Sequence, residues 1–117
     1  FTPYEKIWLV GDATELGWSL DNIEATTSQT MTLKEAGNPY VFTWTGALNN
    51  GELKFSCDLQ KDWGGFWVKA TRTDEPFGGQ NKAQCILETG GNDYKLKVTA
   101  GTYTITIDTL NETITVE

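Results

Sequence analysis

Apolar and polar residues alternate with a period of two along most of the chain, and this alternation constrains the fold more than any other feature of the sequence. The clearest example is the segment 102–108, where Tyr103 and Ile105 alternate with threonines. Successive side chains of a strand point to opposite faces of a sheet, whereas the apolar residues of a helix recur about every 3.6 residues. Helical spacing is not sustained for three turns in any segment, so the pattern predicts an all-β fold.

About eight or nine strand-like runs follow one another at the spacing of roughly 8–12 residues that is typical of antiparallel sandwiches. With 117 residues the chain has room for one domain. We therefore predict a single antiparallel β-sandwich over residues 1–117, of immunoglobulin-like type. Residues 11–29 are expected to form a long loop with one helical turn, and residues 74–82 a surface loop. The expected strands are residues 6–10, 31–34, 40–45, 52–58, 66–70, 83–88, 94–98, 102–108 and 112–116.

Two turns predict hairpins. Asn49-Asn50-Gly51 is a strong turn signal because Asn and Gly tolerate a positive φ. It is expected to join residues 40–45 and 52–58 as neighbouring strands. Residues 102–108 and 112–116 are expected to form a second hairpin that closes the domain.

The faces of two strands can be assigned from the same alternation. Residues 6–10 are apolar on both faces, as expected for a central strand that is covered on each side. In residues 52–58 the two faces differ. The inward residues are Leu53, Phe55 and Cys57, and the outward residues are Lys54, Ser56 and Asp58.

The charge of the chain limits its partners. Its formal net charge is -7, and the nine Lys and Arg residues are scattered, whereas nucleic-acid binding needs clustered positive charge. An anionic membrane surface is disfavoured for the same reason, and no apolar run approaches the roughly 18 residues of a membrane helix. The chain has no histidine, the commonest general base and neutral metal ligand. We expect an uncharged partner, no nucleic acid, no membrane insertion, and no metal or cofactor.

Acidic side chains leave two alternatives open. Calcium prefers oxygen ligands, and four acids crowd one loop: Asp12, Glu15, Asp21 and Glu24. A glycoside hydrolase needs two carboxylates about 5–9.5 Å apart, and the candidates are Asp58, Asp62, Asp74 and Glu75. A small sandwich offers little depth for desolvating an acid and raising its pKa, so no catalytic residue is expected.

Cys57 and Cys85 lie in apolar, strand-like runs. Two buried thiols that pack as small hydrophobes, and a disulfide between them, both remain open, because sequence does not define the distance between their Cα atoms.

The chain has five tryptophans, and their positions separate them into two groups. Trp8 and Trp44 lie inside expected strands and are predicted to belong to the core. Trp18 and Trp63 lie in expected loops, where large aromatic residues suggest a binding role. Trp67 begins a strand and is compatible with either role.

Carbohydrate binding would explain loop tryptophans, because the C–H face of a pyranose ring stacks on an indole while polar side chains bind the hydroxyl groups. Trp63 is the strongest candidate, since its neighbours are charged residues or glycines. Trp18 could instead fold back to close one end of the sandwich. The polar candidates from the same region are Lys61, Asp62, Arg72, Asn81 and Lys82.

Four segments resemble domains of the SusE/SusF family of starch-utilisation outer-membrane lipoproteins, in the same order and at similar spacing. They are Ile7 to Trp18 (IWLVGDATELGW), Tyr40 to Gly46 (YVFTWTG), Glu52 to Phe55 (ELKF) and Tyr103 to Asp108 (YTITID). The arrangement is also similar to starch-binding modules attached to amylases. The resemblance covers nearly the whole chain.

The resemblance implies a non-catalytic β-sandwich that binds an α-glucan at the extracellular face of the outer membrane, as one domain of a longer lipid-anchored protein with other glycan-uptake proteins beside it. Family sites combine two aromatic side chains with basic and amide ones. Transferred to this chain, they correspond to Trp18 and Trp63, with Arg72 and Lys82 as basic residues. The alternative is a spacer domain without a glycan site, which would bury both tryptophans.

Overall fold

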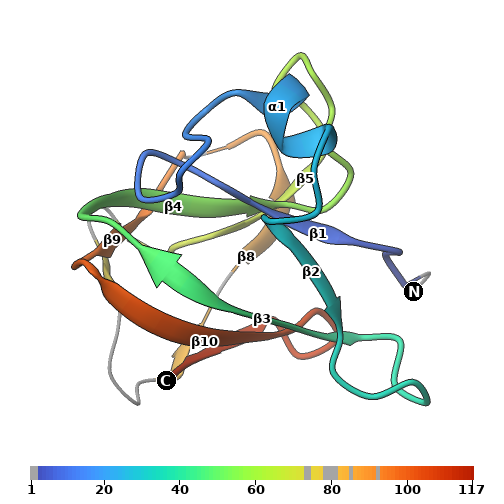
Figure 1. Cartoon of the computed structure of the whole chain (residues 1–117). Helices are drawn as coiled ribbons and strands as arrows, with labels where there is room; N and C mark the ends of the chain where they lie inside the picture. The colour runs from blue at the N-terminus through green and yellow to red at the C-terminus, as the bar shows by residue number, and fades with distance from the viewer. Residues whose placement is uncertain (1–2, 73–74, 78–81, 85, 92) are drawn as a thin grey trace.

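A computed structural model describes residues 3–72, 75–77, 82–84, 86–91 and 93–117, with side chains undescribed at 82–84 and 86. Within these ranges the chain forms eleven strands and one short helix, which confirms the all-β prediction (Figure 1). The strands are β1 (Ile7–Val10), β2 (Thr30–Leu33), β3 (Val41–Leu48), β4 (Gly51–Ser56), β5 (Phe66–Lys69), β6 (Glu75–Phe77), β7 (Lys82–Gln84), β8 (Ile86–Thr89), β9 (Leu96–Val98), β10 (Gly101–Asp108) and β11 (Thr113–Val116). The helix is α1 (Leu20–Glu24), and no helix in the described ranges is long and apolar enough to cross a membrane.

The strands form two layers that β2 joins along one side. β2 pairs with β1 through Met31 and Ile7, and with β3 through Leu33 and Phe42. One layer continues from β3 to β10, β11 and β7, and the other from β1 to β4, β5, β8 and β9. Figure 1 shows β2 running from the layer of β1 and β4 to the layer of β3 and β10, so that the sandwich approaches a barrel.

The main core lies between these layers. β1 and β4 contribute side chains such as Leu9 and Phe55, and the opposite layer contributes Phe42, Ile105 and Ile107, all fully buried. Burial of an apolar side chain of this size stabilises the fold by about 1.5–3 kcal/mol. The alternation seen in the sequence therefore identified the inward residues of β4 and β10.

A second apolar cluster covers the outer face of β1 and β4. It contains five buried side chains with Trp8, Leu16 and Trp18 packed against them. The buried members are Val10, Leu20, Ile23, Leu59 and Trp67. The prediction that β1 is covered on both faces is confirmed, and the loop 11–29 with its helix α1 provides part of the cover.

The hairpin predicted at residues 49–51 is wrong. In the described part of the chain β3 pairs with β2 and β10, whereas β4 pairs with β1, β5 and β9. The turn therefore carries the chain from one layer to the other. Ala13 lies between the end of β3 and the start of β4. Its N–H donates to the Glu52 carbonyl at 3.1 Å, and its carbonyl accepts the Asn49 N–H at 2.8 Å. This close approach requires glycine at position 11, where a Cβ would lie 2.1 Å from the Glu52 carbonyl oxygen.

The C-terminal hairpin of β10 and β11 is confirmed. Two other segments differ from the prediction. The expected surface loop 74–82 contains β6, which pairs in parallel with β9 and places Phe77 in the core beside Tyr103. The expected strand 83–88 is divided between β7 and β8, which pair with different strands, β11 and β5.

The tryptophans predicted for the core lie at its boundaries. Trp8 packs against the outer cluster and Trp44 against the main core, each partly buried. The Trp44 indole lies over Gly46, where a Cβ would be 2.5 Å from the ring, and its N–H donates to the Ser28 carbonyl at 2.8 Å. Cys57 is buried in the core, and Cys85 lies outside the described residues.

Candidate functional site

The loop between β4 and β5 presents Trp63 to solvent. Trp63 has a φ of +68°, a left-handed conformation that costs a bulky residue on the order of 1–3 kcal/mol. Hydrogen bonds between residues close in sequence stabilise this conformation. The Trp63 N–H donates to the Gln60 carbonyl at 3.2 Å, and the Gly64 N–H donates to the Asp62 carboxylate at 3.0 Å. The turn therefore fixes the indole in an exposed position despite an unfavourable backbone conformation.

Trp18, Trp63 and Trp67 form a tryptophan cluster over the outer face of β4. Trp67 is 2% exposed and its ring stacks on that of Trp63, with centroids 6.1 Å apart and planes 15° apart. Its indole N–H donates to the carbonyls of Trp63 and Gly64 at 3.3 and 3.1 Å. Trp18 lies 6.2 Å from Trp63 with its plane inclined by 57°. Trp63 remains 46% exposed, so the cluster offers one open indole that packs against two neighbouring indoles.

Lys54 of β4 lies under this cluster. Its ammonium nitrogen is 3.9 Å from the centre of the Trp67 ring and 5.8 Å and 5.9 Å from those of Trp63 and Trp18. A cation over an indole face is attracted by the quadrupole of the ring. The prediction that Lys54 and Ser56 point outward is correct for the sheet, but both are buried, because the tryptophan cluster and Leu59 cover this face.

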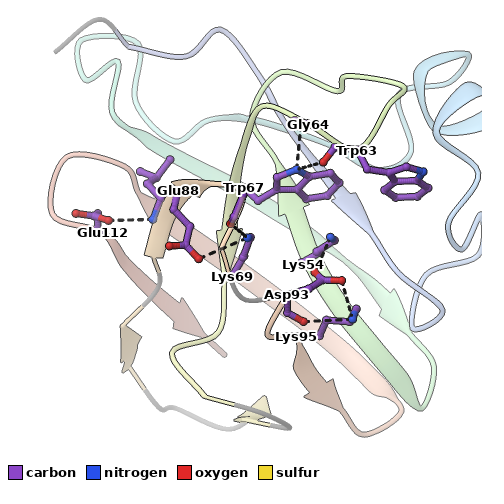
Figure 2. Close-up of polar contacts among 11 residues, drawn as sticks. Lys54, Trp63, Gly64, Trp67, Lys69, Glu88, Asp93, Lys95 and Glu112 are labelled. Carbon is purple, nitrogen blue, oxygen red and sulfur yellow. Dashed lines mark hydrogen bonds and ion pairs between the residues drawn. The ribbon is translucent and has the colours of Figure 1, made fainter.

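An ion-paired chain extends from Lys54 toward solvent. Lys54 donates to one Asp93 carboxylate oxygen at 2.8 Å, and Lys95 lies 3.0 Å from the other. Figure 2 shows Lys54, Asp93 and Lys95 in sequence beneath the indole of Trp67, with Lys69 and Glu88 beside them. The side chain of Asp93 is 57% exposed, so its carboxylate is held in position by two lysines while remaining accessible.

The pKa values of this pair move in the same direction. Burial lowers the pKa of Lys54 below its usual value, and the hydrogen bond and charge of Asp93 oppose this only in part. Burial raises the pKa of Asp93, but the hydrogen bonds from Lys54 and Lys95 and their charges outweigh it, so its pKa lies below the usual value. Asp93 is therefore an ionised hydrogen-bond acceptor at neutral pH.

The cluster and the ion-paired chain enclose a surface hollow of about 390 Å³. This volume lies within the range of roughly 300–1,000 Å³ that is usual for small-molecule sites. Its walls combine indole faces with both hydrogen-bond donors and acceptors, as a polyhydroxylated ring requires. The lining residues are Trp18, Glu52, Lys54, Trp63, Asp93 and Lys95.

A larger hollow, of about 710 Å³, lies beside Tyr4, Phe66 and Leu110. Two of its polar side chains have hydrogen-bond partners within the protein. The Thr109 hydroxyl donates to the Tyr40 carbonyl, and the Glu112 carboxylate accepts the Leu87 N–H. Glu112 is the one charged residue among its described lining, whereas four charged residues line the hollow at Trp63, which therefore offers a sugar more donors and acceptors.

The structure brings together only some of the residues predicted for the site. Trp18 and Trp63 line the 390 Å³ hollow, whereas Asp62 shapes the turn beneath Trp63. Trp67, also a candidate for ligand stacking, is 2% exposed and its ring stacks on that of Trp63, so it adds little open surface beside the 390 Å³ hollow. Arg72 is exposed, its Nε lies 3.7 Å from a Glu75 carboxylate oxygen, and it is not among the residues that line the hollow.

Lys82 lies in β7, whose backbone pairs with β11 at Thr115, and its side chain is not among those described. Asn81 lies outside the described residues. Lys61 pairs with Asp21 and Glu24 of α1, two of the acids considered for calcium.

Sequence reasoning missed the polar half of the site, which consists of Glu52, Lys54, Asp93 and Lys95. One signal was present. Lys54 lies on the outward face of a strand whose following loop carries Trp63, and a loop aromatic of that kind needs a surface to pack on. Asp93 and Lys95 carried no local signal, because only the pairing of β9 with β4 brings them to Lys54.

The family model of SusF/SusE starch-specific carbohydrate-binding modules matches residues 6–117. This chain belongs to that family. Searches of curated proteins and of solved structures returned no match. SusF/SusE modules are starch-specific and non-catalytic, so this domain is a non-catalytic member of a carbohydrate-binding family.

The carboxylates considered for catalysis have structural partners in this SusF/SusE module. Asp58 accepts hydrogen bonds from Gln60 and from the Phe66 N–H. Glu75 accepts one from Thr71. Asp74 lies outside the described residues.

Proposed function

We propose that this domain binds α-1,4-glucan chains by stacking glucose rings on Trp63 and Trp18, with Asp93, Lys95 and Glu52 binding the hydroxyl groups. The observation that carries the proposal is the 46% exposure of Trp63 beside a hollow lined with charged side chains. A spacer domain would bury both loop tryptophans, and the open indole favours binding.

The geometry of the two indoles favours a curved ligand. Their planes are inclined by 57°, so two successive sugar rings that each stack on one indole must also be inclined to each other. α-1,4 linkage turns successive glucose rings in this way, whereas β-1,4 linkage produces a flat ribbon. We therefore expect maltooligosaccharides to bind and cellooligosaccharides of equal length to bind much more weakly.

Binding is expected to be weak. An open surface leaves much of each sugar in contact with water, and only the excess over the entropic cost of association appears as affinity. A dissociation constant of roughly 10 μM to 1 mM corresponds to about -7 to -4 kcal/mol.

We further propose that the module belongs to a cell-surface glycan-uptake system, within a lipid-anchored protein on the extracellular face of the outer membrane and beside other uptake proteins. The support is the SusF/SusE family membership. Surface labelling of cells that express the full-length protein, with and without protease treatment, tests this placement.

Affinity electrophoresis in gels containing amylose, pullulan or dextran tests the binding activity, with tryptophan fluorescence as a second readout. Retardation by amylose together with a change in emission supports the proposal. Unaltered migration and emission with all three glucans would instead identify a spacer.

A further inference from the structure

A second, smaller hollow continues from the first beyond Asp93. Its volume is about 170 Å³. Lys54, Trp63 and Asp93 line both hollows, and the residues that line only the second are Trp67, Lys69, Gly90 and Gly91. The two hollows therefore adjoin at Lys54, Trp63 and Asp93.

The size of the second hollow makes it an extension of the first. At about 170 Å³ it lies below the range of roughly 300–1,000 Å³ that is usual for independent small-molecule sites. It shares the exposed indole of Trp63 with a hollow that lies within this range. A ligand that occupies the second hollow is thus expected to reach it from the first.

The far wall of the second hollow is suited to the approach of a polymer. Gly90 and Gly91 have φ values of +70° and +74°, and a Cβ at Gly90 would meet nothing within 4 Å. Consecutive glycines in this conformation leave the backbone open to close approach. Lys69 anchors the turn, because its ammonium donates to the Gly90 carbonyl at 2.7 Å and lies 3.5 Å from Glu88.

We infer that the glucan chain runs past Trp63 through both hollows, so that the site selects a chain of several glucose units over maltose. The inference rests on the proposed function and adds a length requirement to it. The tryptophan pair supplies stacking for the first rings, and the wall of Lys69, Gly90 and Gly91 contacts the rings that follow. Longer ligands gain these contacts without a second loss of translational and rotational entropy, because the following rings are covalently linked to the first.

Calorimetric titration of the unmodified domain with maltose through maltoheptaose tests the inference. We expect affinity to rise by about tenfold or more between maltotriose and maltoheptaose, which is about 1.4 kcal/mol. Equal affinity for these two ligands would overturn the length requirement while leaving starch binding intact. If no maltooligosaccharide binds, the proposed function fails as well.

Two variants test whether the gain in affinity with ligand length comes from the second hollow. Gly90→Asn adds a side chain where there is open space, and asparagine tolerates a left-handed backbone. Lys69→Gln removes the charge and keeps a donor for the Gly90 carbonyl. Both are expected to bind maltotriose within about twofold of the unmodified domain while losing most of the tenfold length advantage. The matched controls are Gly37→Asn, also in open space, and the exposed Lys34→Gln.

The outcomes are distinct. If both variants retain the full length advantage, the longer chain does not pass through the second hollow. If they lose maltotriose and maltoheptaose binding equally, the wall supports the tryptophan cluster and provides no additional contact. Thermal melts identify a variant that has unfolded, and the titration series on the unmodified domain does not depend on either variant.

Discussion

Replacement of Trp63 by alanine removes the exposed indole, and the structure sets the size of the expected effect. An aromatic side chain of this kind carries roughly 150–250 Å² of surface, so an exposed fraction of 46% leaves about 100 Å² for a sugar ring to cover. At about 25 cal/mol per Å², covering it contributes about 2.5 kcal/mol. Affinity for amylose is therefore expected to fall by roughly 60-fold, to below detection in an affinity gel.

The same substitution should affect stability only moderately. Trp63→Ala removes one stacked aromatic contact, with Trp67, worth about 0.5–1.5 kcal/mol. Trp44→Ala is the contrasting control. It removes an indole that packs against the main core and donates to the Ser28 carbonyl, so we expect a loss of about 3 kcal/mol in stability. Binding should be retained below the lowered melting temperature, because Trp44 is not among the residues that line the hollow.

Affinity gels and thermal melts of both variants distinguish a binding role of Trp63 from a structural one. If Trp63→Ala binds amylose normally and melts at the usual temperature, the glucan binds elsewhere on the surface. If it binds normally but melts far earlier than Trp44→Ala, the indole is a structural element, and its 46% exposure was a misleading guide to its role.

Three further predictions follow from individual contacts. Asp93→Asn deprives the buried Lys54 of its ionic partner, so amylose affinity measured by calorimetry should fall about tenfold and stability by about 1–3 kcal/mol; unchanged binding would remove Asp93 from the site. Gly11→Ala forces a Cβ against the Glu52 carbonyl, and its melting temperature should fall by more than about 8 °C; a smaller loss would show that the loop can move aside. Asp93 and Asp108 have pKa values below the usual 3.8, so the unfolded chain binds more protons than the folded one below that value. Their contribution to stability is complete above pH 3.8 and is lost as the pH falls through the lowered pKa values, and melts between pH 5 and pH 2.5 should show this decline.

Much of the strand content and of the aromatic half of the site could be predicted from the sequence. Alternation in residues 102–108 is a consequence of the two-residue repeat of a strand, and it correctly placed Ile105 and Ile107 in the core. The exposure of Trp63 was foreseeable because its charged and glycine neighbours do not bury a side chain by themselves. Strand alternation and the sequence neighbours of Trp63 are local properties, so they do not depend on how the strands pair.

The pairing of strands and the polar half of the site depended on tertiary structure. The turn at 49–51 has the chemistry of a hairpin, but turn chemistry defines only a change of direction and does not determine whether the two strands share a sheet. Ala13 bonds to both sides of the turn and separates β3 from β4. This contact joins segments that are distant in sequence.

The role of Lys54 follows from the same kind of contact. Alternation alone places its side chain on an outward face of β4, where a lysine is ordinarily solvated. The loop 11–29 and the turn that carries Trp63 fold over this face and bury the ammonium, and β9 supplies Asp93 as its partner. Sequence by itself determined the inward residues of strands such as 102–108 and made Trp63 the strongest candidate for an exposed indole. Only the packing of distant segments decided what lies beside that tryptophan, because burial and ion pairing depend on distances in space.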